Sequence, residues 1–289
     1  MQFLKKIFYP IGATLGFIQN HFKAMVFLLI VVLIFIPKSE DELTQNNLEE
    51  IYLSGPIMDA TQLLQHIQDV TDNKNIKGVL LNVNSPGGAV APSIEISYAI
   101  KRLKQHKPVV VYASGTIASG SYYASIWADE IIANPGSMVG SIGVIMEGAD
   151  LSGIMSKIGI KTQSIQAGKY KKVGTSEREW KPYEINELNK VIQGTYNMFV
   201  NDVAKARKLD PKKRDIFANA HIFTASQAKK VGLIDKVGVK YDAQNELVKL
   251  SGIKTPIWNK EDKFEKFIKK ISATTAVTLN TYFPALVLK

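Results

Sequence analysis

The chain has 289 residues, a formal net charge of +10, 46% hydrophobic residues and no cysteine. This length is enough for one or two domains with a substantial core. The absence of cysteine excludes disulfides, thiol nucleophiles and cysteine-ligated metals, and the four histidines form no cluster, so we expect neither a metal nor a cofactor. No nucleic-acid-binding motif accompanies the positive charge, so an anionic membrane surface explains it better than nucleic acid does, while most individual lysines are expected on solvated helix faces.

The N-terminal part of the chain predicts a membrane anchor. Residues 24–36 are an uninterrupted apolar run, shorter than the roughly 20 residues of a typical spanning helix, and its extension to 22–37 gives a thin transmembrane segment. Lysines in the cytoplasmic or interfacial residues 1–21 precede this run and acidic residues follow it. The positive-inside rule then places the N-terminus in the cytoplasm and the bulk of the chain beyond the inner (cytoplasmic) membrane. A buried core helix and a cleaved signal peptide are the alternatives.

Segments typical of strands and helices alternate after a polar, acidic linker over residues 38–49. The predicted strands cover residues 51–53, 78–83, 109–113 and 130–133, and the predicted helices between them cover residues 58–70, 93–105 and 123–127. Because strands that alternate with helices form parallel sheets with right-handed crossovers, we expect an α/β fold with a largely parallel sheet flanked by helices.

The second half of the chain contains fewer regular elements. The predicted segments are a glycine-rich stretch over 136–145, a short helix over 151–160, a strand over 162–166, a lysine-rich loop over 168–175, a long amphipathic helix over 184–208 and a basic, then apolar, C-terminal tail over 253–289. Thr224 and Gln227 have the spacing of a capping box that opens a further helix, and Gly232 is placed to end it.

The stretch around Ser119 is the candidate functional site. An apolar strand over 109–113 leads into small residues over 115–121, and an apolar segment of helical character follows. Small residues between a strand and a helix allow a sharp turn that exposes one side chain at the end of the strand, where ligands bind in open α/β sheets. We therefore predict that Ser119 is a nucleophile. The alternative is that the small residues only allow close packing of a helix on the sheet.

Two other nucleophilic arrangements have weaker support in the sequence. Ser226 and Lys229 have S-x-x-K spacing, but the companion motifs of penicillin-binding enzymes are absent and the capping box already explains this stretch. A Ser-His-Asp triad would need His221, which is the only histidine after Ser119. A G-x-S-x-G elbow is absent because Ile117 stands at the position of the first glycine.

Four motifs occur in order and at the spacing of a known family. They are Asn84–Gly88, Ala118–Tyr123, Gly140–Val144, and the stretch from Phe223 to Asp235 that begins Phe-Thr and ends Gly-Leu-Ile-Asp. Together they closely resemble the signal peptide peptidase SppA (protease IV) family in its short single-domain form. The resemblance covers a serine peptidase domain over residues 50–252. It implies a Clp protease/crotonase-like fold, and a serine–lysine dyad in place of a Ser-His-Asp triad.

The resemblance implies roles for five residues. Ser119 matches the nucleophile, Lys171 the general base, and Ser141 the serine that orients the lysine. Gly88 and Gly120 match the positions whose backbone N–H groups form the oxyanion hole. A lysine accepts a proton only when it is neutral, so the ordinary lysine pKa of about 10.4 has to fall by several units through desolvation and nearby positive charge.

The sequence departs from the family pattern at two positions. Lys172 stands where an acidic residue is expected after the base, and His221 stands where an arginine is common. Because Lys169, Lys171 and Lys172 share one loop, the departure leaves open which lysine is the base.

The resemblance implies a membrane-anchored serine endopeptidase that cleaves remnant signal peptides or other membrane-associated peptides. It also implies a ring-like homo-oligomer, an octamer for the short form, in which Ser119 of one protomer meets Lys171 of the next. Two alternatives stay open. A non-catalytic oligomeric scaffold on the same fold would be favoured by a Lys171 side chain that points away from Ser119. A crotonase-like acyl-CoA enzyme would need a carboxylate near the oxyanion hole and a soluble chain.

Overall fold

The computed structural model describes residues 19–28 and 45–259. Residues 19–28 are helical and belong to the first of two units into which the chain divides, Met1–Gln45 and Asn46–Lys289. Among the described residues, no helix is both long enough and apolar enough to cross a membrane. The predicted anchor over 22–37 extends beyond the described helix, and most of the predicted tail over 253–289 also lies outside the described residues.

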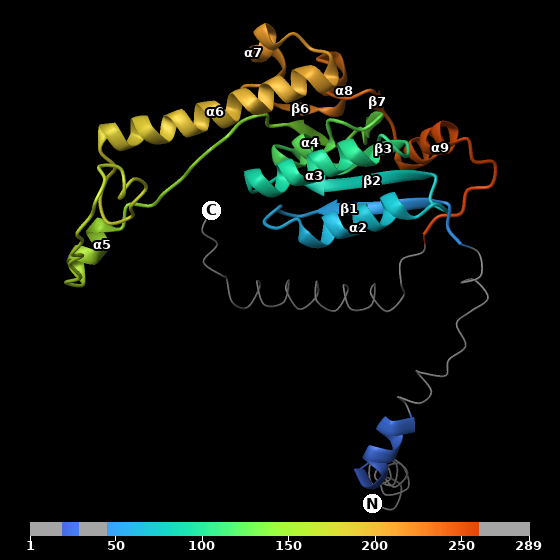
Figure 1. Cartoon of the computed structure of the whole chain (residues 1–289), viewed down its shortest axis with the longest axis horizontal. Helices are drawn as coiled ribbons and strands as arrows, with labels where there is room; N and C mark the ends of the chain where they lie inside the picture. Colours follow the sequence, from blue (N-terminus) through green and yellow to red (C-terminus); the bar gives the residue numbers. More distant parts are fainter. Residues whose placement is uncertain (1–18, 29–44, 260–289) are drawn as a thin grey trace, which may run out of the picture. The chain divides into compact units, whose positions relative to one another are not determined.

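A seven-stranded sheet lies at the centre of the second unit (Figure 1). Its strands are β1 (Leu48–Ser54), β2 (Gly78–Ser85), β3 (Val109–Ala118), β4 (Glu130–Ala133), β5 (Met138–Gly140), β6 (Ile222–Thr224) and β7 (Lys236–Val237). β1, β2, β3, β4 and β7 are neighbours in that order and pair in parallel. β5 pairs in parallel with the end of β3, whereas β5 and β6 pair antiparallel. The predicted α/β fold with a largely parallel sheet is confirmed.

Nine helical segments accompany the sheet in the second unit's described residues, and most of them contribute to a hydrophobic core on one of its faces. They are α2 (Thr61–Asp72), α3 (Val90–Leu103), α4 (Gly120–Ser125), α5 (Ser152–Lys157), α6 (Pro182–Arg207), α7 (Arg214–Phe217), α8 (Ala225–Lys230), α9 (Lys240–Ser251) and the 3-10 helix η2 (Pro211–Lys213). Residues of α2, α3, α4, α6 and α8 enter the larger core, and residues of α9 enter the smaller core. The predicted helices over 58–70, 93–105 and 184–208 are confirmed, with their ends shifted by a few residues.

The alternation of side chains along the central strands builds these two cores. Val79, Leu81 and Val83 of β2 belong to the larger core, whereas Leu80 belongs to the smaller core under α9. Successive residues of a strand point to opposite faces of the sheet. A run that is continuously apolar in the sequence is therefore a strand that is buried on both faces, as expected for a parallel sheet covered by helices.

The predicted capping box at the start of α8 is also confirmed. The Gln227 N–H donates to the Thr224 hydroxyl at 3.3 Å, and the Thr224 N–H donates to the Gln227 side chain at 2.9 Å. Gly232 has φ 82° two residues after the helix, which is the left-handed conformation that commonly follows a helix end.

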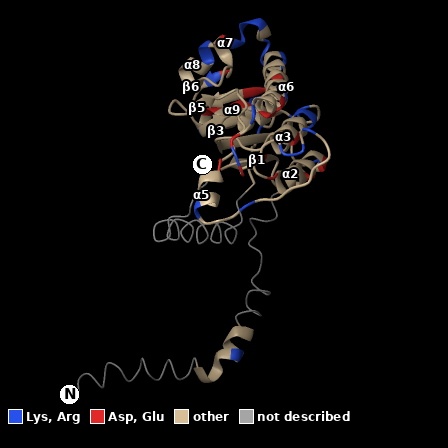
Figure 2. Ribbon diagram, turned by 90° about the vertical axis from the view of Figure 1, so that its left-hand side faces the viewer, with Lys and Arg blue, Asp and Glu red and all other residues tan. Residues whose placement is uncertain are grey.

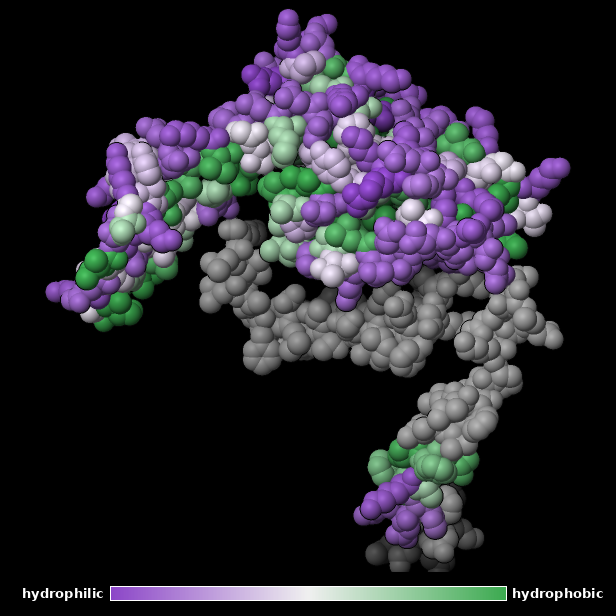
Figure 3. Space-filling view, in the orientation of Figure 1, coloured by the Kyte–Doolittle hydropathy of each residue, from purple (hydrophilic) through white to green (hydrophobic). Residues whose placement is uncertain are grey.

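Residues 145–181 form a segment, here called the arm, that connects the end of the glycine-rich stretch to α6. Exposed apolar side chains are frequent in it, and those of Ile145, Ile154, Ile158 and Ile165 are all more than half exposed. Figure 3 shows such hydrophobic side chains on the surface of α5. The predicted strand over 162–166 is wrong, because these residues have no regular structure and no described strand lies beside them to pair with.

The long helix α6 joins the arm to the core. Phe199, Val200, Val203 and Ala204 are buried in its C-terminal half. In its first half Glu184 is buried, while the side chains that follow are exposed or partly exposed. One end of α6 is therefore held by the core and the other end carries the arm, as Figure 1 shows.

The segments at the two ends of the sheet domain lie side by side. The Asn47 N–H donates to the Ile257 carbonyl at 2.8 Å, and the Asn259 N–H donates to the Leu48 carbonyl at 3.1 Å. Leu48 and Trp258 form a parallel bridge. The start of β1 is therefore held by residues 257–259, which lie near the end of the described part of the chain.

We expect Asn259→Ala to destabilise the domain. The Asn259 side chain accepts from the Glu50 N–H at 2.7 Å and donates to Glu49 Oε1 at 2.9 Å. Partly buried groups that lose such partners typically cost about 1–3 kcal/mol. Urea unfolding would measure the loss. Asn186→Ala, on the exposed part of α6, is the control and should change the free energy of unfolding by less than about 0.5 kcal/mol. Equal losses in the two variants would contradict this role of Asn259.

Candidate active site

Ser119 lies in the turn between β3 and α4. Its backbone has φ 52° and ψ −123°, a combination that residues other than glycine rarely adopt. The Ser119 N–H donates to the Gly140 carbonyl at 2.8 Å, and the Ser119 carbonyl accepts from the Tyr123 N–H at 3.0 Å. Strained residues of this kind persist where the surrounding structure holds them, and they are frequent at functional sites. The turn places Ser119 at the carboxyl end of a central parallel strand.

Gly88 and Gly120 bring two backbone N–H groups to this turn. A Cβ atom on Gly120 would overlap the Ser93 hydroxyl, and one on Gly88 would overlap the backbone of Ile57. The bridge between Ile57 and Gly88 uses the N–H groups of Ile57 and of the residue after Gly88, so the Gly88 N–H is not part of it. Gly120 is the first residue of α4, and the first N–H groups of a helix have no partner inside the helix. Both amides are therefore able to donate to an oxygen atom at this turn.

Ser141 follows β5 and also has a left-handed backbone, with φ 48°. Its N–H donates to the His221 carbonyl at 2.7 Å, and the Ala220 N–H donates to the Ile142 carbonyl at 2.9 Å. Backbone hydrogen bonds from residues 220–221, just before β6, thus hold residues 141–142 in place. His221 contributes its backbone to this arrangement, while its ring lies beside Phe223.

A pocket of about 460 Å³ opens beside Ser119. Its lining residues are Gly88, Val90, Ser93, Ile94, Ser119, Gly120, Tyr123, Ser141, Gly143, Val144, Ile145, Thr195, Met198, Phe199 and Ala220. Four of the five residues to which the resemblance gave a role therefore line one pocket. None of the lining residues is Asp, Glu, Lys or Arg. Lysine and arginine are frequent elsewhere, for example around α7 (Figure 2).

The apolar walls of the pocket consist of residues that the sequence pattern did not assign to a site. Ile94 comes from α3, Tyr123 from α4, and Met198 and Phe199 from α6. Helical periodicity identified an apolar face of α6, but a periodic pattern does not reveal which surface that face contacts. Local sequence therefore predicted Ser119, the family resemblance supplied Gly88, Gly120 and Ser141, and neither identified the apolar wall.

The fifth residue, Lys171, lies in the arm and does not line the pocket. Its two neighbouring lysines have partners there. Lys172 Nζ lies 2.6 Å from Glu177 Oε2, and Lys169 Nζ lies 5.0 Å from the centre of the Tyr183 ring. The Lys171 side chain is exposed and makes no hydrogen bond or ion pair with any described residue. Within one chain, the structure does not bring Ser119 and Lys171 together.

The family of the chain follows from comparison with known proteins. The model of "Peptidase family S49" matches residues 101–254, which is more than half of the chain and includes both Ser119 and Lys171. The chain belongs to peptidase family S49.

Several curated relatives of this S49 member carry protease names. A Methanocaldococcus jannaschii protein, provisionally named a protease, is 41% identical over 198 residues, which cover 68% of this chain and 64% of the relative. An Enterococcus faecium protein, provisionally named signal peptide peptidase SppA, is 37% identical over 191 residues, which cover 64% of this chain and 54% of the relative. The chain thus spans less than two thirds of the length of either relative. The predicted membership of the SppA (protease IV) family is confirmed.

Among solved structures, a serine-to-alanine mutant of 1510-N, titled a membrane-bound stomatin-specific protease, aligns with a TM-score of 0.48 and 16% identity. The alignment covers 76% of this chain and 100% of that chain.

In this S49 member, an ion pair between the partly exposed Arg178 and the buried Glu184 joins the arm to the start of α6. Arg178 donates to both carboxylate oxygens of Glu184, at 2.7 and 2.8 Å. The Lys181 N–H also donates to Glu184, at 2.8 Å. These hydrogen bonds lower the pKa of Glu184 to about 2, and the bonds from Arg178 have the largest effect. The Trp180 indole N–H, which donates to the Thr175 carbonyl at 2.8 Å, links the lysine loop to the same point.

We expect this fastening to weaken in acid. Because the pKa of Glu184 is about 2 in the folded chain and 4.5 ordinarily, its stabilising contribution is complete above about pH 4.5 and is lost as the pH falls towards 2. A variant that keeps only Trp180, with Trp127→Phe and Trp258→Phe, should show a fluorescence change in that window. Adding Glu184→Gln should remove the change. A change of the same size with Glu184→Gln would show that another group is responsible.

Proposed function

We propose that the chain is a serine endopeptidase with a Ser-Lys dyad, and that its catalytic site forms between copies of the chain. The observation that carries this proposal is the strained turn that presents Ser119 beside two glycine amides, at the mouth of an apolar pocket. Membership of peptidase family S49 supports a hydrolase that acts on peptide bonds.

The chemistry follows from the groups at this turn. Ser119 Oγ attacks the carbonyl carbon of the substrate while its proton passes to a lysine amine. The developing oxyanion accepts hydrogen bonds from the Gly88 and Gly120 amides, and each such donor is typically worth about 10²–10³ in rate. The lysine returns the proton to the leaving amine as the C–N bond breaks. Water then attacks the acyl-serine ester, which releases the new carboxyl group and restores Ser119.

We assign the base to Lys171 of a neighbouring copy. Lys172 is paired with Glu177, and Lys169 lies beside aromatic rings, so Lys171 is the lysine of this loop with an available amine. Ser141, in the same pocket as Ser119, would accept a hydrogen bond from that amine and orient it. The exposed isoleucines of the arm form the type of surface that marks a protein interface. We propose a closed homo-oligomeric ring, with eight copies as the expected number.

The proposed substrates are remnant signal peptides or other membrane-associated peptides. The pocket offers an apolar surface without charged side chains, which suits the hydrophobic residues of such peptides. A single-pass anchor over residues 22–37, with the N-terminus in the cytoplasm and the peptidase domain outside, would place the enzyme where these peptides partition. The provisional name of the Enterococcus relative points to the same substrate class.

One observation favours the alternative of a non-catalytic scaffold, namely the distance of Lys171 from the pocket within one chain. The acyl-CoA alternative has no such support, because the described pocket-lining residues include no carboxylate. The following two experiments separate the peptidase from the scaffold.

We expect Ser119→Ala and Lys171→Ala to lower the cleavage rate of a fluorogenic, signal-peptide-like substrate by at least about 10³-fold, because each removes a member of the dyad. Both variants should keep their fold and assembly by circular dichroism and size exclusion. Lys169→Ala and Lys172→Ala are the matched controls and should retain cleavage. Loss of activity in a control but not in Lys171→Ala would move the base to that lysine. Cleavage by Ser119→Ala would contradict the role of Ser119 as the nucleophile and favour the non-catalytic scaffold.

Co-expression of the two inactive chains tests where the dyad forms. If Ser119 and Lys171 come from neighbouring copies, an equal mixture restores the correct pair at about one interface in four, and about a quarter of wild-type activity should return. If the dyad forms within one chain, every site lacks one member and the mixture stays inactive. Mass spectrometry of the assembly would confirm that the two chains have mixed.

A further inference from the structure

The polar side chains inside the Ser119 pocket use their hydroxyl protons in bonds within the protein. The Ser93 hydroxyl donates to the Ala89 carbonyl at 2.8 Å, and the Thr195 hydroxyl donates to the Val191 carbonyl at 3.0 Å. These bonds leave Ser119 and Ser141 as the hydroxyl groups that face a substrate at the mouth. A side chain that enters the pocket meets few groups able to replace its hydrogen bonds to water, which disfavours polar and charged residues.

Tyr123 forms part of the inner wall and is itself tied to a carboxylate. It lies one helical turn after Ser119, is 3% exposed, and its ring contacts the Phe199 ring edge-on at 4.9 Å. Its hydroxyl donates to Asp202 Oδ2. Burial and this hydrogen bond raise the pKa of Tyr123 far above its ordinary value, so the hydroxyl keeps the proton that it donates.

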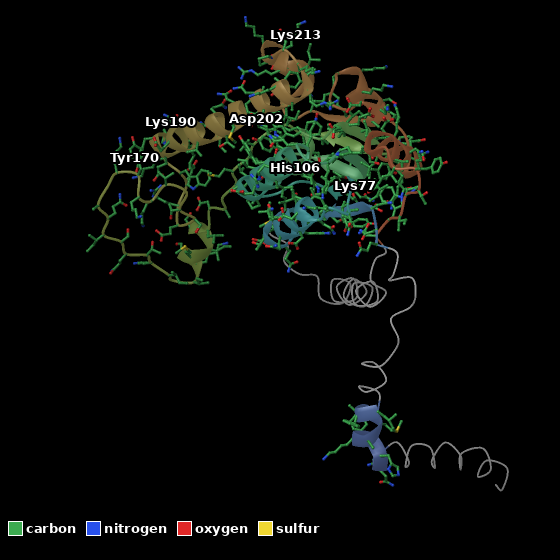
Figure 4. All side chains as sticks on the ribbon, turned by 45° about the vertical axis from the view of Figure 1, so that its right-hand side comes forward. Lys77, His106, Tyr170, Lys190, Asp202 and Lys213 are labelled. Carbon is green, nitrogen blue, oxygen red and sulfur yellow. The ribbon has the colours of Figure 1, made fainter. Side chains whose placement is uncertain are left out.

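Asp202 lies behind this wall on the pocket face of α6. Thr195, Met198 and Asp202 follow each other at helical spacing, and the first two line the pocket. Asp202 is not itself a lining residue; it is partly exposed and contacts the pocket wall through the hydroxyl of Tyr123, which does line the pocket. In the described part of the chain, no lysine or arginine makes an ion pair with Asp202. Figure 4 labels Asp202 on α6, on the side of the sheet domain and away from Tyr170 in the arm.

We infer that Tyr123 and Asp202 determine which side chain the pocket accepts. The Tyr123 ring makes the inner wall apolar and covers a carboxylate that would otherwise bind a basic side chain. The pocket therefore selects uncharged, apolar residues next to the scissile bond. Removal of the ring would connect the space beside Ser119 with Asp202. A carboxylate would then line the inner end of the pocket. This inference rests on the proposed peptidase function, because it assigns a substrate side chain to the pocket beside Ser119.

Binding of two matched peptides to the full-length Ser119→Ala protein tests the inference without requiring turnover. The peptides carry a fluorophore and differ at one residue, norleucine or lysine, which have stems of equal length and differ in charge. Fluorescence anisotropy should show a norleucine preference of about 10²-fold, because the pocket cannot compensate a buried ammonium. Tyr123→Phe keeps the ring and should keep the preference.

Opening the wall should reduce or abolish this preference. In Tyr123→Ala, lysine peptide affinity should rise by about 10–100-fold relative to norleucine, as expected for a newly formed charge pair. Adding Asp202→Asn should cancel that gain, although the space created by Tyr123→Ala is still present. Tyr123→Val, a smaller change, is the second variant if Tyr123→Ala does not fold. A folded open variant without any gain for lysine, or a gain that survives Asp202→Asn, would overturn the inference.

Turnover of the wild-type protein separates the two proposals. If the wild type cleaves the norleucine peptide but the open variants show no gain in affinity for the lysine peptide, the peptidase function is supported and the role of Asp202 is contradicted. If the binding series behaves as expected but the wild type never cleaves, the pocket is a selective binding site and the peptidase proposal falls.

Discussion

The turn at Ser119 depends on the close contact of two backbone segments. A Cβ atom on Gly87 would lie 2.5 Å from the Gly120 nitrogen and 2.7 Å from the Ala118 oxygen, so the chain after β2 has to be glycine where it meets the chain after β3. The Ser121 hydroxyl joins the same two segments, since it donates to the Ser85 carbonyl at 2.7 Å. Packing on both sides therefore holds the positive φ of Ser119, and the same contact brings the Gly88 and Gly120 amides to the turn.

This contact also explains which parts of the site were predictable. Glycines and small serines at the ends of two apolar strands are visible in the sequence, and the parallel fold brings such strand ends together. Strand β3 and Ser119 were accessible for that reason. The capping box of α8 was visible in its own local spacing, and Gly88, Gly120 and Ser141 came from the family resemblance. The apolar wall was not, because residues such as Met198 and Phe199 are also typical of an ordinary core helix.

Two further differences have physical causes of other kinds. Residues 162–166 have strand-like composition but lack a neighbouring strand, and an isolated strand cannot satisfy its backbone hydrogen bonds. Asn259 pairs with the start of β1 across more than 200 residues of sequence, and no local pattern reports such a contact. The position of Lys171 differs for another reason. The lysine-rich loop was predicted from the sequence, but within one chain Lys171 does not line the pocket that contains Ser119.

The length of α6 sets a mechanical limit on the arm. With 26 residues the helix is about 39 Å long, so a tilt of one degree at its core end moves the other end by about 0.7 Å. Catalytic groups have to be held within about 0.5 Å of their working geometry. Packing at the core end of α6 alone therefore cannot hold the other end of the helix with this accuracy. Whatever surface receives the tip of the arm therefore completes the alignment, and a reactive group there would be accurately placed only while the arm is docked.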